Sequence, residues 1–477
     1  MAKITLNVLL LLLSPLTVIC GGPLRSMFLD VTPPMVKNGI DPGKPLFLTP
    51  LLESGQIEKA RQLSLVGPLK GTNVKSYAGY LTVNKPYNSN LFFWFFPAKV
   101  NPTKAPVVMW LQGGPGGSSM FGLFVEHGPF GVNAKAQLVP RNTTWQTNYS
   151  MLYVDNPVGT GFSFTENEAG YATDEEDVGN DMYSALVQFF QIYYEYSQLD
   201  FYVTGESYAG KYVPAIAYKI HSVQANGSAK SMINLRGIAI GDGLCDPEMM
   251  FPAFSGFVYN AGLMDENQSA YAKTQTDQIV EQIQQKQWIN AFKTFDNLLN
   301  GDLAPYPSFY TNVTGSTDYY NYMRTKSPAD FNFFYKFLAL PEVRLAIHVG
   351  NLTFNAGTEV EKHLLTDVMQ SIKPWLAVLM NYYKVMIYNG QLDVIIPVPS
   401  TESFLMTVPW QHLDEYKRAE RHIWKVHPDD GEVAGYVRRV HDFYQVIVRS
   451  AGHILPHDQP EVGHDLINRF ISGRPFF

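Results

Sequence analysis

Residues 201–210 read FYVTGESYAG, an apolar run that ends in a turn of small residues around Ser207. A helical pattern follows over residues 208–222. A strand, a sharp turn that carries a serine and a following helix together form a nucleophile elbow. Gly205 and Ala209 are small, as a turn that brings neighbouring backbone close to the serine requires. The stretch predicts that Ser207 is an attacking nucleophile, although an ordinary Gly/Ser turn after a strand has the same local composition.

Strands and helices alternate on both sides of this turn. Short apolar runs, typical of strands buried on both faces of a parallel sheet, occur at residues 91–96, 106–111, 151–154, 201–204, 235–240, 385–388 and 446–448. Helical patterns lie between some of them, as at 176–194. This alternation predicts an α/β-hydrolase fold, with a mostly parallel central sheet flanked by helices and a largely helical cap insertion.

The alternation stops between residues 243 and 344. Asp265 fits a helix N-cap there, Gly301 fits a helix end, and a Tyr- and Asn-rich stretch without a strand pattern follows. This helical cap either shapes a substrate pocket or serves as a stabilising appendage without substrate contact. The predicted division is a signal peptide at 1–21, an arm or possible pro-segment at 22–45, core at 46–242, cap at 243–344 and core at 345–477.

The N-terminus has the layout of a secretory signal peptide. Lys3 supplies a positive start, residues 8–19 are mostly apolar, and small residues around Gly21 permit cleavage. The run is short for a spanning helix, although an N-terminal membrane anchor is the alternative. Sequons that favour glycosylation lie at Asn142, Asn148, Asn226, Asn267, Asn312 and Asn351. We therefore expect a glycoprotein of the secretory pathway, either secreted or lysosomal/endosomal, with no membrane span after signal removal.

Composition and charge argue against a disordered chain and against a nucleic-acid-binding protein. Hydrophobic residues make up 46% of the chain and charged residues 17%, which is typical of a folded protein with a large core. The formal net charge of -7 gives no basic surface for nucleic acid. The chain lacks an HExxH motif and paired cysteines, so we expect no metal and no other cofactor. Cys245 stands alone after signal removal and is expected to be a buried small hydrophobe.

A nucleophile elbow predicts partners in the chain order Ser, acid, His. Asp393 follows the apolar strand pattern at 384–388, and His453 follows the pattern at 443–449. Both residues fall at the carboxyl ends of predicted strands, where sites form in open α/β sheets. We expect His453 to take the proton of Ser207 as general base. Asp393 is expected to hold the imidazole in the correct tautomer.

A Gly-rich segment, WLQGGPGGSS at residues 110–119, follows another predicted strand. It lacks the Gly-Lys-Ser/Thr ending of a phosphate-binding loop. Glycines allow backbone N–H groups to approach a developing negative charge, so we expect an oxyanion loop here. The backbone N–H of Tyr208, which follows the predicted nucleophile, is expected to be a second donor.

Together these motifs resemble the serine carboxypeptidase family, peptidase family S10. The similarity extends from about residue 45 to the C-terminus and includes WLQGGPGGSS, DNPVGTGFSF at 155–164, GESYAGKYVP, NGQLD and GHILP. Gln112 and Gly117 are most similar to the vitellogenic-like branch. The resemblance implies an enzyme, active as monomer or homodimer, that releases single C-terminal residues from peptides and proteins through an acyl-enzyme.

The resemblance also implies roles for individual residues. It assigns Ser207, Asp393 and His453 to a catalytic triad, with Gly114 and Tyr208 as oxyanion donors. It further implies a set that binds the substrate's terminal carboxylate: Trp110, Gln112, Gly113, Glu126 and Glu206.

Two carboxyl groups that are held close together cannot both ionise at low cost, so one keeps its proton at raised pH. A protonated Glu206 would donate a hydrogen bond to the substrate carboxylate, and an ionised one would repel it. We therefore expect substrate binding to weaken as pH rises, with an acidic working range. Without the family match, ordinary structural roles remain open for Glu126, Glu206 and Gln112.

Two positions depart from the pattern of many relatives. Gly117 stands where many have a cysteine that forms a disulfide across the cap boundary, and Gln112 stands where many have asparagine. The first change removes a tether and the second changes the geometry of carboxylate binding, but neither touches the triad. Two alternatives stay open: an acyltransferase or esterase on the same scaffold, and a glycoprotein that has no catalytic activity.

Overall fold

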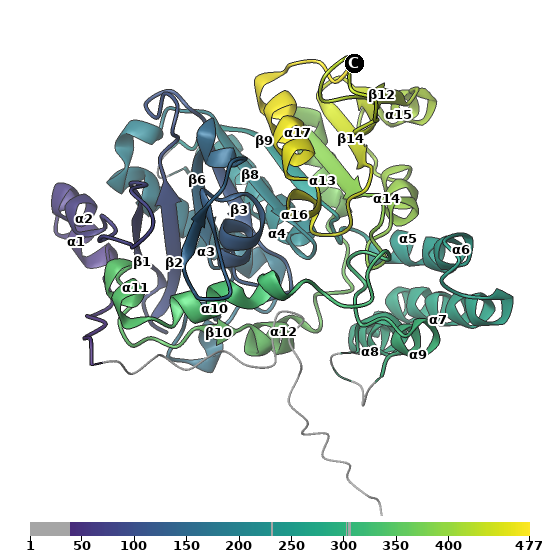
Figure 1. The fold of residues 1–477 in the computed structure, drawn as a ribbon, viewed down its shortest axis with the longest axis horizontal. Helices are drawn as coiled ribbons and strands as arrows, with labels where there is room; N and C mark the ends of the chain where they lie inside the picture. Colours follow the sequence, from purple (N-terminus) through teal and green to yellow (C-terminus); the bar gives the residue numbers. More distant parts are fainter. Residues whose placement is uncertain (1–38, 230–231, 302, 304–306) are drawn as a thin grey trace, which may run out of the picture.

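A computed structural model describes residues 39–229, 232–301, 303 and 307–477 (Figure 1). The predicted signal peptide and the first part of the predicted arm, residues 22–38, lie outside the described residues. Among the described helices, none combines the length and the apolar character that a bilayer crossing requires.

A ten-stranded sheet forms the centre of the molecule. Its inner strands are parallel to one another and follow in the order β6 (Ser150–Val154), β3 (Val107–Leu111), β8 (Phe201–Glu206), β9 (Leu235–Gly241), β11 (Lys384–Gly390) and β14 (Phe443–Val448). Most of their residues are buried, because helices cover the sheet, and this explains the continuous apolar runs in the sequence. The predicted α/β-hydrolase fold with a mostly parallel sheet is confirmed.

Antiparallel strands complete the sheet at both edges. They are β1 (Tyr77–Asn84) and β2 (Ser89–Phe96) beside β6, and β13 (Gly435–Val440) and β12 (His422–Trp424) beside β14. Of these, the sequence predicted only β2. In β13, which reads GYVRRV, buried and more exposed positions alternate, so a search for continuous apolar runs passes over it. Two small ribbons pair β4 (Phe130–Val132) with β5 (Leu138–Pro140) and β7 (Thr160–Gly161) with β10 (Asn355–Ala356).

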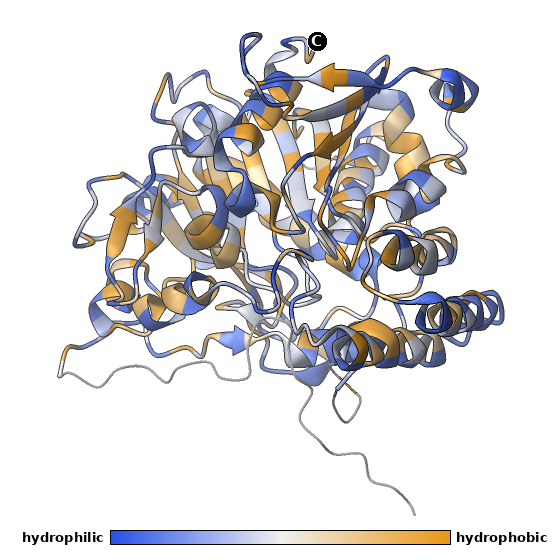
Figure 2. Cartoon of the chain, turned by 45° about the vertical axis from the view of Figure 1, so that its right-hand side comes forward, coloured by the Kyte–Doolittle hydropathy of each residue, from blue (hydrophilic) through white to orange (hydrophobic). Residues whose placement is uncertain are grey.

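Long helices pack side by side against the sheet. In α3 (Glu175–Ile192) the side chain of Asp174 caps the first turn, which also carries three acidic residues that suit a helix N-terminus. Helix α4 (Ala209–Ala225) contacts both α3 and α13 (Lys373–Tyr382). Figure 2 shows the hydrophobic residues concentrated on the central strands and the helix faces that cover them.

Between β9 and β11 the chain leaves the central sheet. Over the predicted cap range, the described residues form α5 (Pro247–Met250), α6 (Phe254–Asn260), α7 (Glu266–Gln284), α8 (Trp288–Phe295), α9 (Phe309–Thr314), α10 (Phe333–Leu338) and α11 (Pro341–Ala346). Asp265 and Gln268 form a capping box at the start of α7, and Gly301 ends the following helical segment at a φ of 80°. Helices α7–α9 group to one side of the sheet, while α10 and α11 return along the first half of the core (Figure 1).

The other described helices have 4 to 8 residues, apart from α17, which has 13. They are α1 (Thr49–Glu53), α2 (Ile57–Leu63), α12 (Thr358–Leu364), α14 (Val398–Leu405), α15 (Leu413–Arg418), α16 (Leu455–Asp458) and α17 (Pro460–Ser472). Single 3₁₀ or π turns are η1 (Gly122–His127), η2 (Trp145–Thr147), η3 (Glu168–Gly170), η4 (Tyr194–Tyr196), η5 (Phe251–Ala253), η6 (Asp296–Asn300) and η7 (Ala329–Asn332).

Candidate active site

Ser207 occupies a strained turn between β8 and α4. Its φ is 62°, in the left-handed region that costs a residue with a Cβ about 1–3 kcal/mol. Hydrogen bonds on both sides hold this conformation. The Ser207 N–H donates to Gly241 O at 2.9 Å, and the Ser207 carbonyl accepts from Gly210 N at 2.9 Å and Leu244 N at 3.0 Å. The turn therefore presents the serine side chain at the carboxyl end of the central strand.

Glycines beside the serine are required by close packing of backbone. A Cβ on Gly205 would lie 2.5 Å from Leu111 O, and one on Gly210 would lie 2.7 Å from Leu244 N. Any larger residue at either position would displace a strand or the loop after β9. This explains the small residues that the sequence shows around Ser207.

Asp393 and His453 meet at the ends of β11 and β14. His453 Nδ1 lies 2.7 Å from Asp393 Oδ2, and both side chains are fully buried. The other oxygen, Oδ1, accepts from Ile395 N at 2.9 Å and Ile396 N at 3.3 Å. Burial alone would lower the pKa of His453, but Asp393, with smaller contributions from Glu206 and Asp318, outweighs burial, so the pKa lies above its ordinary value.

The second imidazole nitrogen of His453 is available for chemistry. Nε2 has no hydrogen-bond partner among the described residues, and no hydrogen bond joins it to Ser207. Burial raises the pKa of Glu206, the residue directly before Ser207, and the charge of His453 opposes this rise, so the ring and the elbow are electrostatically coupled. The structure thus brings the Asp393–His453 pair to the same end of the sheet as the predicted nucleophile.

Tyr320, in the predicted cap, supports His453 in a way that the sequence did not reveal. Its carbonyl accepts from His453 N at 2.6 Å, and its ring stacks on the imidazole at a centroid distance of 5.0 Å and an angle of 15°. A Cβ on Gly452 would lie 2.1 Å from Tyr320 O, so the small residue before His453 admits this contact. No local pattern in the Tyr-rich stretch distinguishes Tyr320 from its neighbours.

Asp242 is a second residue that sequence reasoning missed. It follows β9, is fully buried, and accepts from Gly390 N at 2.8 Å through Oδ1. Ligand atoms of Asp242, Asp393 and His453 lie within 4.8 Å of one another. Burial raises the pKa of Asp242 well above its ordinary value, and the charge of Asp393 raises it further. Asp242 therefore keeps its proton and faces Asp393 as a neutral acid; its position after a central strand was the available signal.

The Gly-rich loop packs directly on the elbow. A Cβ on Gly113 would lie 2.4 Å from Tyr208 N and 2.7 Å from Ser207 Cβ. Gly114, at a φ of 123°, lines the same pocket as Ser207 and Tyr208. In the described part of the chain, no acceptor is bonded to the backbone N–H of Gly114 or Tyr208. Two free donors beside a serine can bind an oxyanion that forms at a carbonyl carbon.

Asp155 connects the DNPVGTGFSF segment to the Gly-rich loop through hydrogen bonds. It accepts from Ser118 Oγ at 2.6 Å, Ser119 N at 3.1 Å and Phe162 N at 2.8 Å. These bonds tie the end of the loop to the segment after β6. Burial raises the pKa of Asp155 to about 7, although the same hydrogen bonds oppose the rise.

Trp110, Gln112 and Glu206 form a buried chain of hydrogen bonds beside Ser207. Trp110 Nε1 donates to Gln112 Oε1 at 3.1 Å, and Gln112 Nε2 donates to Glu206 Oε1 at 2.6 Å. Tryptophan can only donate, so the amide oxygen of Gln112 faces it and the amide nitrogen faces Glu206. The longer amide at this position is thereby fixed in orientation.

Glu126, on η1, faces Glu206 as a second buried carboxyl group. Burial raises the pKa of Glu206 to about 7, although His453 and Gln112 oppose the rise. Burial raises the pKa of Glu126 well above its ordinary value, and the nearby charge of Glu206 raises it further. Among the described side chains no donor faces either oxygen of Glu126, so a proton held between the two carboxyl groups provides the missing bond.

Comparison with known proteins identifies the family. Residues 68–473 match the family model of the serine carboxypeptidases. The chain belongs to this family. The resemblance inferred from the sequence motifs is confirmed.

Known relatives align with this carboxypeptidase over almost its whole length. It is 56% identical over 474 residues to the probable serine carboxypeptidase CPVL of Homo sapiens, with 99% of this chain and 98% of the relative covered. It is 48% identical over 438 residues to the venom serine carboxypeptidase of Apis mellifera, with 91% of this chain and 92% of the relative covered. The crystal structure of Kex1, a prohormone-processing carboxypeptidase of Saccharomyces cerevisiae, shares the fold, with a TM-score of 0.75 and 22% identity over 87% of this chain and 96% of that one.

The pocket that contains Ser207 in this carboxypeptidase combines core and cap. Its lining includes Gly114, Pro115, Tyr208, Leu244, Phe251, Phe292, Phe295, Asn300, Glu361, Val368, Ile395 and Ile396. The three phenylalanines come from η5 and α8, within the predicted cap. Apolar walls with a few polar groups are typical of small-ligand sites, and the inserted helices supply part of those walls.

Cys245 is buried, whereas most of the sequon asparagines are exposed. Cys245 is free and buried, and burial raises the pKa of its thiol, so it packs as a small hydrophobe. Five of the sequon asparagines are exposed. Asn148 is half-buried and donates from Nδ2 to Asn468 Oδ1 at 3.0 Å, so its amide nitrogen is less accessible.

Proposed function

We propose that this carboxypeptidase releases single C-terminal residues from peptides and proteins through an acyl-enzyme on Ser207. The observation that carries the proposal is the Glu126–Glu206 pair, which adjoins the elbow directly because Glu206 precedes Ser207 in the chain. Burying a carboxyl group without hydrogen-bond partners costs stability, and Glu206 Oε2 has no partner among the described residues, so a substrate group could supply one. A neutral carboxyl group here suits recognition of a free terminal carboxylate, which an ester or an internal peptide bond lacks.

The proposed reaction begins when His453 Nε2 takes the proton of Ser207 and Oγ attacks the last peptide carbonyl. The N–H groups of Gly114 and Tyr208 stabilise the oxyanion. His453 then gives the proton to the leaving amine, and the C-terminal residue departs. In the second half, His453 deprotonates a water that attacks the acyl-enzyme, and Ser207 is released.

Asp393 holds the Nδ1–H tautomer of His453 and stabilises the imidazolium that forms. Asp242 stays protonated and donates a hydrogen bond to Asp393, and so positions this carboxylate without adding a second charge. A metal is not part of this scheme, because the acid, base and oxyanion roles are all met by groups of the chain. The distance between His453 and Ser207 is expected to shorten when substrate binds, as hydrogen bonds at catalytic sites often do.

Recognition of the substrate carboxylate falls to Glu206, Gln112 and Gly113. Below a pH of about 7, Glu206 is neutral and donates a hydrogen bond to the carboxylate, while Glu126 supports it with a further proton. Neutral Glu206 also ceases to raise the pKa of His453, so the imidazole in the complex acts as a base at lower pH. Both effects favour an acidic working range.

Paired peptides test this function. We expect purified mature protein to remove single residues from a peptide free acid, fastest at mildly acidic pH, and to leave the same peptide intact when its C-terminus is amidated. Mass spectrometry of timed samples from pH 4 to 8 measures both. Equal attack on the amide would support an esterase or broader acyl hydrolase instead, and absence of cleavage by folded protein would support a glycoprotein without activity.

Replacing Glu206 by glutamine is expected to change the pH dependence of KM. In the wild type, Glu206 loses its proton above a pH of about 7, so KM for a free acid should rise roughly tenfold per pH unit beyond that point. Glutamine stays neutral and can still accept from Gln112, so KM of Glu206→Gln should stay flat across this range. On the acid side, protonation of His453 lowers kcat in both proteins.

Steady-state kinetics between pH 5 and 9 check this prediction. An uncharged ester substrate serves as the control, because its KM should not follow the ionisation of Glu206. A wild-type KM that is independent of pH, or a Glu206→Gln profile with the same rise, would remove Glu206 from carboxylate recognition.

We further propose that the protein acts in the secretory pathway, either secreted or in lysosomal/endosomal compartments. The predicted signal peptide and the exposed sequons support this location. The acidic range expected from Glu206 suits the endosomal and lysosomal interior best.

A further inference from the structure

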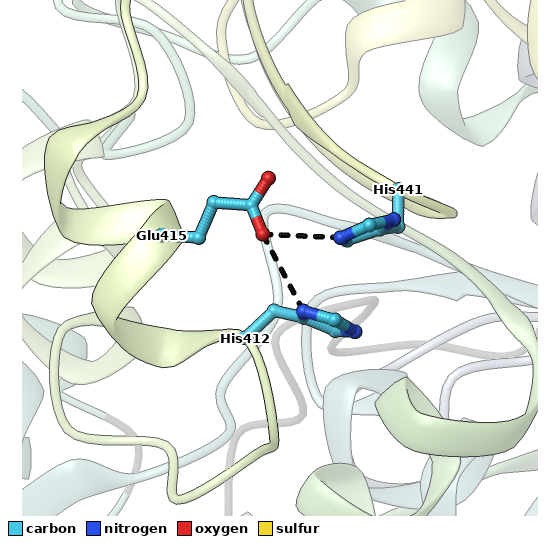
Figure 3. A group of neighbouring side chains, drawn as sticks. All are labelled: His412, Glu415 and His441. Carbon is cyan, nitrogen blue, oxygen red and sulfur yellow. Dashed lines mark hydrogen bonds and ion pairs between the residues drawn. The ribbon is translucent and has the colours of Figure 1, made fainter.

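A cluster of metal-ligating side chains lies away from the pocket, at the antiparallel edge of the sheet. His412 is the residue before α15, Glu415 lies in the first turn of this helix, and His441 lies in the tight turn between β13 and β14. Figure 3 shows the two imidazole rings and the carboxylate pointing toward one another. The proposed peptidase reaction uses none of these residues.

The distances within this cluster suit a coordinated ion. Glu415 Oε2 lies 3.4 Å from His412 Nδ1 and 3.0 Å from His441 Nε2, and the three ligand atoms lie within 4.8 Å of one another. Bonds of about 2.0–2.2 Å in a tetrahedral site separate neighbouring ligand atoms by roughly 3.3 Å. The two separations from the carboxylate oxygen are therefore close to those between neighbouring ligands of a tetrahedral ion.

The backbone that carries the cluster is firmly held. The rings of Trp410 and Tyr416 pack on Phe443 at centroid distances of 5.5 and 5.4 Å, which fixes the segment around α15 to β14. Arg439 Nε donates to the carbonyl of His441 at 3.0 Å and holds the turn. The imidazole centroids of His412 and His441 lie only 3.9 Å apart, so the two rings already lie next to each other beside the carboxylate.

The chemistry of the donors selects the kind of ion. Two imidazole nitrogens and one carboxylate oxygen are preferred by zinc and similar first-row transition metals, whereas calcium and magnesium prefer oxygen alone. All three side chains are partly exposed, which leaves a fourth position open to water. A second group at the surface, Glu168, Glu359 and His363, has one imidazole and two carboxylates and so offers a weaker site for zinc.

We propose that His412, Glu415 and His441 bind one zinc ion, with water as the fourth ligand. The ion joins α15 to the β13–β14 turn, so binding stabilises the edge of the sheet. An ion that binds the folded state alone raises the melting temperature by mass action.

Metal titration of the full mature protein tests this site. After treatment with chelator, we expect the wild type to bind one equivalent of Zn²⁺ in calorimetry and to show a rise in melting temperature. Co²⁺ in place of Zn²⁺ should give the intense visible absorption of four-coordinate cobalt with nitrogen ligands. Cu²⁺ should quench the fluorescence of Trp410, whose ring lies 5.4 Å from that of His412.

Two variants locate the site. His441→Asn suits the local φ of 52°, which asparagine tolerates, and should keep the melting temperature of the metal-free protein while weakening Zn²⁺ binding roughly 100-fold or more. His363→Ala, the matched control in the second group, should bind Zn²⁺ as the wild type does. Unchanged binding by His441→Asn, loss of binding in His363→Ala, or no binding by the wild type would each overturn the proposal.

Discussion

Replacing Ser207 by alanine is expected to lower kcat on peptide free acids by roughly 10⁶-fold, with KM changed by less than about threefold. The hydroxyl is the group that forms the acyl-enzyme in the proposed reaction, whereas the carboxylate-binding groups stay in place. Alanine meets the same left-handed φ of 62° as serine, so the elbow itself should persist.

Release of the terminal residue, followed by mass spectrometry, and labelling by a fluorophosphonate probe measure this effect. The matched control is Ser222→Ala on α4, the helix that follows Ser207; among the described residues its hydroxyl donates to Lys219 O at 3.1 Å. It should keep activity within about twofold, since surface changes of this kind alter little. Cleavage or probe labelling that persists in folded Ser207→Ala would assign the nucleophile elsewhere.

The second large effect is expected from Asp393→Asn, which should lower kcat by about 10⁴-fold. Asparagine places an amide where His453 Nδ1 needs an acceptor, so the imidazole loses its tautomer and its charge partner. Asp242→Asn makes the same chemical change in the neighbouring carboxyl group but should cost no more than about tenfold, roughly the worth of one hydrogen bond. Asp242 is already neutral, and an amide there can still donate to Asp393 and accept from Gly390 N.

The check is a comparison of kcat for the two variants, after thermal unfolding has shown that they have equal melting temperatures. The contrast between them is the informative quantity, because both changes are isosteric and both sites are fully buried. Equal losses in Asp242→Asn and Asp393→Asn would show that Asp242 is ionised, and that the negative charge at the site is shared between the two carboxyl groups.

The inner strands and the elbow were predictable because their signals are local. A strand buried on both faces is apolar throughout, and the turn at Ser207 requires small neighbours, so each produces a pattern in consecutive residues. The same locality explains why Asp393 and His453 could be selected as strand-end residues. The edge strands β12 and β13 were missed because partly exposed positions interrupt their apolar pattern. In β1, which reads YAGYLTVN and is mostly buried, a glycine and polar residues interrupt the apolar run instead.

The supporting residues were less accessible to sequence reasoning. Tyr320 reaches His453 only after the inserted segment folds back over the core, and no spacing in the chain encodes this contact. The acidity of Asp242 depends on burial and on the neighbouring charge of Asp393, which a sequence does not show. The roles of the triad, the oxyanion donors and the carboxylate-binding set, and the boundary of the cap at 344, stay predictions that the experiments above address.

The contact between Tyr320 and His453 has a practical consequence for engineering. The phenylalanines that line the pocket come from η5 and α8, whereas the support of the imidazole comes from a later part of the same insertion. Residues 247–300 can therefore be exchanged between family members to retarget selectivity while 316–324 are retained. A graft that replaces the whole insertion would exchange the scaffold of the general base together with the specificity, and chimaeras of that design are expected to fold yet turn over poorly.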